Sequence, residues 1–175
     1  MSLPQIPTPV FLDSSVLQTV SDHGGFVFEN VEPPAKARIR KVPGGMQELD
    51  ALRLIFLANQ RNSIPMVISD NSLKEVADRG HRGYLSWAFE ILEWCESFEG
   101  ARYTRTFLRP SLFGYLSAKD RILLEDSIYL GCRSFLTMER KLPRNRDHIR
   151  KFTGLEILRP TDFWTILEPW APIFM

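Results

Sequence analysis

Four short apolar segments, each close to turn residues, constrain the fold of this chain more than any other feature. They lie at residues 9–12, 65–68, 133–137 and 155–158. A continuous apolar run of this length is typical of a strand buried on both faces of a sheet. Helical patterns separate the runs, and strands that alternate with helices indicate a mostly parallel sheet. We therefore predict an α/β protein with a three-layer α/β/α fold and a mostly parallel central sheet of four or five strands.

Apolar periodicity and capping residues predict the helical segments. Amphipathic patterns predict helices over Met46–Asn59 and Tyr84–Phe98, and a closing helix over Pro160–Leu167. Asp70 is expected to cap the helix that follows the second apolar run. Ser117-x-x-Asp120 resembles an N-cap pattern, and the helix it opens is expected to stop at Gly131.

Residues 21–45 stand out as a long segment rich in glycine and proline. We expect an irregular insertion there, in which residues 26–28 and 37–40 alternate enough to form a hairpin. Such a long excursion within a compact domain is usually functional or mobile. Without a repeat or an interdomain linker, residues 1–175 are expected to form one domain that carries this insertion.

Composition favours an ordinary globular protein of the cytoplasm. Lys and Arg number 22 against 21 Asp and Glu, so any site for a polyanion must be a local patch. Two cysteines do not make a disulfide scaffold. We see no signal peptide and no apolar stretch long enough to cross a membrane, and we expect no membrane association.

Four acidic residues are placed where the predicted strands and helices would bring them together. Asp13 follows the first apolar run, Glu75 comes after the second, Glu139 follows the third, and Asp120 opens a helix. In an open parallel sheet the carboxyl ends of the strands meet in one crevice. Clustered carboxylates repel each other unless cations neutralise them, and all-oxygen ligands suit Mg²⁺ or Mn²⁺. This pattern predicts metal-assisted hydrolysis of phosphodiester bonds.

The same positions resemble those of the PIN-domain family, which includes the VapC-like ribonucleases. The resemblance rests on three blocks: residues 10–17 with Asp13, residues 68–76 with Glu75, and residues 120–142. In the last block Asp120, a small residue at Ser127, then Gly131, Thr137 and Glu139 keep the family's spacing. The family more often has Asp at the position of Glu139, and residues 21–45 are not part of its pattern.

The resemblance implies a Mg²⁺- or Mn²⁺-dependent endoribonuclease acting on single-stranded RNA. Asp13, Asp120 and Glu139 would bind the ions, Glu75 would be a further ligand or a base, and Ser14 and Thr137 would support them. A common setting for such domains is the toxin of a toxin–antitoxin pair, with an antitoxin protein as partner. The resemblance also allows a homodimer.

Each acidic residue also has a plain structural interpretation. Asp13 could cap the following helix, Glu75 could be solvated, Asp120 could serve only in a capping box, and Glu139 could pair with neighbouring cations. Thr137 could orient a carboxylate or merely satisfy a strand end. Asp126 is expected to be solvated. A PIN-like binding module with weak or no catalysis, and an unrelated flavodoxin-like domain, therefore remain as alternatives.

Basic residues directly after Glu139 would flank the acidic crevice. We expect Arg140, Lys141, Arg144 and Arg146 to hold a nucleic-acid backbone there, because cations around a metal-filled acidic centre suit phosphates. Ordinary solvated loop charge is the alternative. A second basic cluster lies at residues 36–41.

Overall fold

A computed structural model describes residues 6–77, 82–98 and 108–171 of the chain. Its centre is a sheet of four parallel strands in the order β2-β1-β3-β4. The strands are β1 (Val10–Leu12), β2 (Met66–Val67), β3 (Ser134–Leu136) and β4 (Glu156–Leu158). Phe11 pairs with Val67 on one side and with Phe135 on the other. The predicted parallel sheet is confirmed, with four strands.

Successive strand residues contribute to the two faces of the sheet, each of which has its own apolar core. Val10, Leu12 and Leu136 belong to one buried cluster, whereas Phe11 and Phe135 belong to the other. The rings of Phe11 and Phe135 stack with centroids 5.2 Å apart. This alternation follows from the two-residue period of a strand, and burying both faces explains why the strands read as continuous apolar runs.

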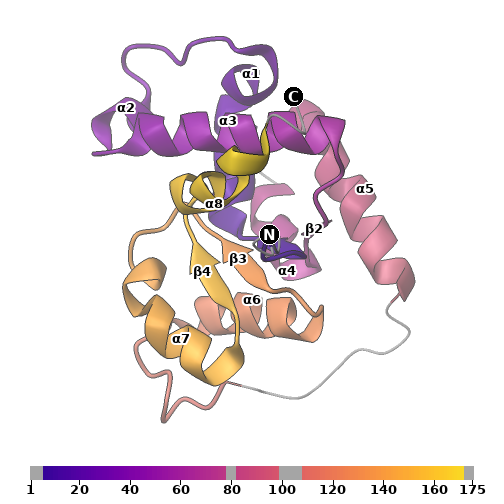
Figure 1. Ribbon diagram of the computed structural model, residues 1–175, viewed down its shortest axis with the longest axis vertical. Helices are drawn as coiled ribbons and strands as arrows, with labels where there is room; N and C mark the ends of the chain where they lie inside the picture. Colours follow the sequence, from indigo (N-terminus) through magenta and orange to yellow (C-terminus); the bar gives the residue numbers. More distant parts are fainter. Residues whose placement is uncertain (1–5, 78–81, 99–107, 172–175) are drawn as a thin grey trace.

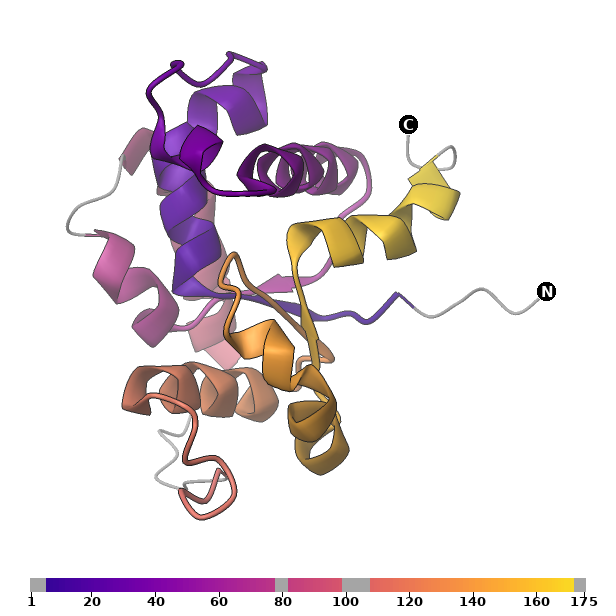
Figure 2. The ribbon, with the colours of Figure 1, turned by 90° about the vertical axis from the view of Figure 1, so that its left-hand side faces the viewer.

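Helices cover both faces, so the molecule has three layers (Figures 1 and 2). The first cluster is completed by α1 (Ser14–Glu29), α3 (Gly45–Arg61), α4 (Asp70–Ala77), α5 (Arg82–Phe98) and α8 (Pro160–Leu167). The second is completed by α6 (Ala118–Tyr129) and α7 (Arg146–Thr153). Short 3₁₀ segments lie at η1 (Leu142–Asn145) and η2 (Glu168–Trp170). The predicted three-layer α/β/α class is confirmed.

The segment at residues 21–45 differs from the prediction. It contains no hairpin: residues 26–28 complete α1, and residues 38–41 form the short helix α2 (Arg38–Lys41). The backbone of α1 is non-helical only at His23. Three or four alternating residues do not distinguish a strand from part of a helix, and here packing decides. Gly24 lies against the ring of Tyr84 from α5, and a side chain at residue 24 would collide with that ring.

Three helix ends were predicted from the sequence. At the start of α6, Ser117 Oγ accepts from the backbone N–H of Asp120, and Asp120 Oδ2 accepts in return from Ser117, which confirms the predicted cap. Gly131 follows α6 with φ of 70°, the left-handed conformation expected just after a helix. At the start of α4 the cap is Ser69 rather than Asp70, because Ser69 Oγ accepts from the N–H of Ser72.

Within the described ranges, no helix is both long enough and apolar enough to cross a membrane.

Candidate functional site

Asp13 lies between the end of β1 and the start of α1, and its carboxylate is almost fully buried at 5% exposure. Three hydroxyls donate to it. Thr137 Oγ1 lies 2.7 Å from Oδ2, Ser15 Oγ lies 2.5 Å from the same oxygen, and Ser14 Oγ lies 3.4 Å from Oδ1. The Asp13 side chain makes no capping hydrogen bond to α1. Its interactions therefore serve to fix a buried carboxylate at the sheet edge.

The same hydroxyls fix the backbone that carries Glu139. Ser15 Oγ accepts from the N–H of Met138 at 3.0 Å, and Thr137 Oγ1 accepts from the N–H of Glu139 at 3.1 Å. Thr137 is completely buried directly after β3. Since β1 and β3 are neighbouring parallel strands, their carboxyl ends meet here, and one network joins Asp13 to the segment that carries Glu139.

Glu139 lies within electrostatic reach of Asp13 and Asp120. Partial burial raises the pKa of Glu139, and the negative charges of Asp13 and Asp120 raise it further, whereas Lys119 and Lys141 oppose the shift. Burial also raises the pKa of Asp13, against the lowering effect of the Ser15 and Thr137 hydrogen bonds and of Lys119. Burial and like charges both disfavour the ionised form of a carboxyl group.

Asp120 lies in the first turn of α6. It is half-buried, and its Oδ2 atom is engaged by the N–H and the hydroxyl of Ser117. Asp120 therefore caps α6, and its charge also raises the pKa of Glu139.

The fourth predicted residue, Glu75, lies in α4, but its side chain falls outside the part of the structure that is described. Among the described residues, no group of three or more His, Cys, Asp or Glu side chains is arranged so that it could hold a metal ion. The charges of Asp13 and Asp120 act on Glu139, but these described side chains do not form a ready-made three-carboxylate cage.

The basic residues that follow Glu139 in the chain are exposed. Arg140 and Lys141 precede η1, Arg144 lies in η1, and Arg146 begins α7. Their role in binding a nucleic-acid backbone stays a prediction.

An exposed aromatic group beside α7 was not foreseen from the sequence. Tyr115 is 45% exposed and Phe152 is 49% exposed. His148 links them: its Nδ1 lies 2.8 Å from the Tyr115 hydroxyl, and its ring centroid lies 4.8 Å from that of Phe152. The periodicity of α7 gives no hint of this group, because Tyr115 comes from a loop more than thirty residues earlier in the chain.

The prediction that Asp126 is solvated was wrong. It is 7% exposed, and its Oδ2 atom accepts a hydrogen bond of 3.0 Å from Asn71 Nδ2. Its position six residues after Asp120 does put it on another face of α6, but α4 covers that face. Ser127 is fully buried and donates to the carbonyl of Leu124, as expected for an inward-facing small residue.

No protein-family model, no curated protein and no solved structure was found to match this chain.

Proposed function

We propose that this protein is a metal-dependent nuclease that hydrolyses phosphodiester bonds, with single-stranded RNA as its substrate. The observation that carries the proposal is the buried Asp13 at the carboxyl edge of a parallel sheet, which hydrogen bonds through Ser15 and Thr137 join to the segment of Glu139, a residue whose pKa the charges of Asp13 and Asp120 raise. Ligand sites of open α/β sheets lie at this edge. The resemblance of the surrounding residues to the PIN-domain family supports the same function.

The donor set suits a hard divalent cation. Asp13, Asp120 and Glu139 offer only carboxylate oxygens, and a bound dication would neutralise the repulsion that the charges of Asp13 and Asp120 exert on Glu139. Asp13 is held rigid by three hydroxyls, whereas Glu139 is exposed and its side chain is free to change rotamer toward an ion. When bound, Mg²⁺ or Mn²⁺ would supply Lewis-acid stabilisation of the phosphate and a water of lowered pKa.

The remaining groups have separable tasks. Thr137 and Ser15 orient the Asp13 carboxylate and, through the N–H groups of Met138 and Glu139, keep the two strand ends in register. Lys119 is the cation that acts on both Asp13 and Glu139, so it favours their ionised forms. A carboxylate that is ionised and held still is ready to accept an ion without reorganisation.

The substrate preference follows from the surface next to this centre. The exposed cations of residues 140–146 suit a phosphate backbone, and the exposed rings of Tyr115 and Phe152, together with the half-buried ring of His148, offer faces on which unpaired bases can stack. Cations combined with aromatic faces are the usual means of binding single strands, whereas duplexes keep their bases stacked internally.

The test is cleavage of a labelled single-stranded RNA with Mn²⁺, with Mg²⁺ and with chelator. We expect cleavage only with metal, and its loss in Asp13→Asn. Asp22→Asn is the matched control: Asp22 lies on α1, the helix that Asp13 precedes, but it is exposed, and its carboxylate accepts a hydrogen bond from Gln18. No cleavage by the wild type under any metal condition would refute the proposal, and so would equal activity of both variants.

A second candidate is a binding module without catalysis. It is favoured by the lack, among the described side chains, of a group of three arranged to hold an ion. RNA that is bound by the wild type but not cut in Mn²⁺ would select this candidate.

A further inference from the structure

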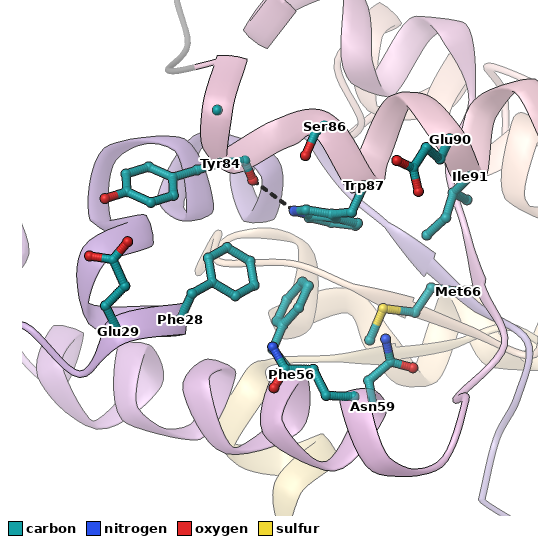
Figure 3. Close-up of a pocket in the computed structure, with 12 residues that line it drawn as sticks. Phe28, Glu29, Phe56, Asn59, Met66, Tyr84, Ser86, Trp87, Glu90 and Ile91 are labelled. Carbon is teal, nitrogen blue, oxygen red and sulfur yellow. Dashed lines mark hydrogen bonds between the residues drawn. The ribbon is translucent and has the colours of Figure 1, made fainter.

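A cavity of about 650 Å³ lies between α1, α3 and α5. Figure 3 shows α5 above it, with Tyr84, Trp87, Glu90 and Ile91, and α1 and α3 to its left and below. Met66, the first residue of β2, closes its inner end. The cavity is large enough for a ligand of the size that protein pockets usually take.

The walls of the cavity are built from aromatic rings. Phe56 meets Phe28 edge to face with centroids 5.6 Å apart, and meets Trp87 in the same way at 4.9 Å. The Tyr84 ring is stacked against that of Phe28 at 6.3 Å. The indole N–H of Trp87 donates to the carbonyl of Tyr84 at 2.7 Å, so this donor is already used and the indole contributes its ring faces.

Among the described residues that line the cavity, the charged ones are both acidic. Glu29 at the end of α1 and Glu90 on α5 are exposed carboxylates, and no described lining residue is Lys, Arg or His. Figure 3 places these two side chains at opposite ends of the group of rings. π-Faces attract cations, and carboxylates do so as well, whereas an anion would meet repulsion from both.

We propose that this cavity binds a small organic cation, an ammonium or guanidinium group carried on an apolar or aromatic body. The body would replace water against Phe28, Phe56 and Met66, and the positive group would lie against a ring face within reach of Glu90. A neutral apolar ligand would use the rings alone, and an anionic ligand would be excluded by charge.

This site is distinct from the acidic centre at the sheet edge. Asp13 precedes the first residue of α1, whereas Phe28 and Glu29 are its last two residues. A 16-residue helix is about 24 Å long at 1.5 Å per residue. The proposal therefore does not depend on the nuclease function, and either can fail without the other.

Calorimetric titration of the full chain with benzyltrimethylammonium tests the proposal. Its uncharged carbon isostere neopentylbenzene has the same shape, and benzoate supplies the opposite charge. We expect the cation to bind, the isostere to bind at least about fivefold more weakly, and benzoate not to bind. Equal affinity for the cation and the isostere would overturn the proposal, because the cavity would then be a plain apolar groove. Lack of binding by the cation would overturn it too.

Variants locate the binding. Glu90→Gln keeps the shape of an exposed side chain, so it should fold normally and weaken cation binding several-fold while leaving the isostere unaffected. Glu93→Gln is the matched control, since Glu93 is exposed on the same helix but does not line the cavity. Trp87→Leu should weaken both ligands, and the cation more. If Glu90→Gln and Glu93→Gln affect the cation equally, the charge effect is nonspecific and the assigned site is wrong.

Discussion

Thr137→Val tests how the acidic centre is held together. Valine has nearly the shape of threonine but lacks the hydroxyl, so the substitution removes the 2.7 Å hydrogen bond to Asp13 Oδ2 and the acceptor for the N–H of Glu139. Thr137 is completely buried, and water cannot replace the lost partner directly. The variant therefore isolates one hydroxyl that serves both strand ends.

The expected loss of stability follows from these contacts. A hydrogen bond to a charged group contributes about 1.5–3 kcal/mol, and an amide left without its partner costs about 1 kcal/mol or more. The added methyl offsets roughly 0.8 kcal/mol of this through burial. The free energy of unfolding should fall by about 2–3 kcal/mol near neutral pH. At 2–4 °C per kcal/mol for a domain of this size, the melting temperature should drop by roughly 4–12 °C.

The loss should depend on pH in a defined direction. The Thr137 hydrogen bond lowers the pKa of Asp13, so it stabilises the ionised carboxylate more than the protonated one. Burial nevertheless keeps that pKa above its ordinary value of 3.8. The cost of Thr137→Val should therefore be largest above the folded-state pKa of Asp13, and should shrink as acid protonates the group.

Urea denaturation at several pH values measures this cost, and Thr153→Val is the matched control. The Thr153 hydroxyl also donates to one acceptor and accepts from the N–H two residues later, but its acceptor is the neutral carbonyl of Ile149. The control should lose about 1 kcal/mol with no such pH dependence. A Thr137→Val variant as stable as the wild type at neutral pH, or a cost that grows in acid, would refute this account of the site.

Three further predictions concern other parts of the molecule. Burial raises the pKa of Asp13, so the charge of Asp13 destabilises the folded state above the folded-state pKa and has no effect below the pKa of the unfolded state. Asp13→Asn should therefore raise the free energy of unfolding near neutral pH. Urea denaturation curves that show no gain would contradict this prediction. Arg140→Ala with Arg144→Ala should flatten the slope of log K for single-stranded RNA against log salt by about 1–1.5, and an unchanged slope would leave these residues as solvated surface. Glu48→Ala removes a 4%-exposed carboxylate that lies 3.0 Å from Arg159 Nη1, so it should cost about 3 kcal/mol by calorimetry, whereas Glu48→Gln should cost less.

The sequence by itself determined the elements that depend on local pattern. The apolar runs predicted a mostly parallel sheet of four or five strands, because a strand buried on both faces is a continuous apolar run without polar alternation. The position of Asp13 at a strand end followed from the same run, and the Ser117–Asp120 cap followed from a four-residue signal. These features are readable because the residues that specify them are neighbours in the chain.

Only the tertiary structure decided which segments, distant in the chain, pack against those elements. Residues 26–28 became helix rather than hairpin because α1 packs against α3 and α5, and Gly24 accommodates a ring that lies sixty residues further along the chain. Asp126 is buried because α4 covers it, and Thr137 holds Asp13 across a sequence separation of 124 residues. No local periodicity encodes such pairings, since they depend on strand order and on which helix covers which face.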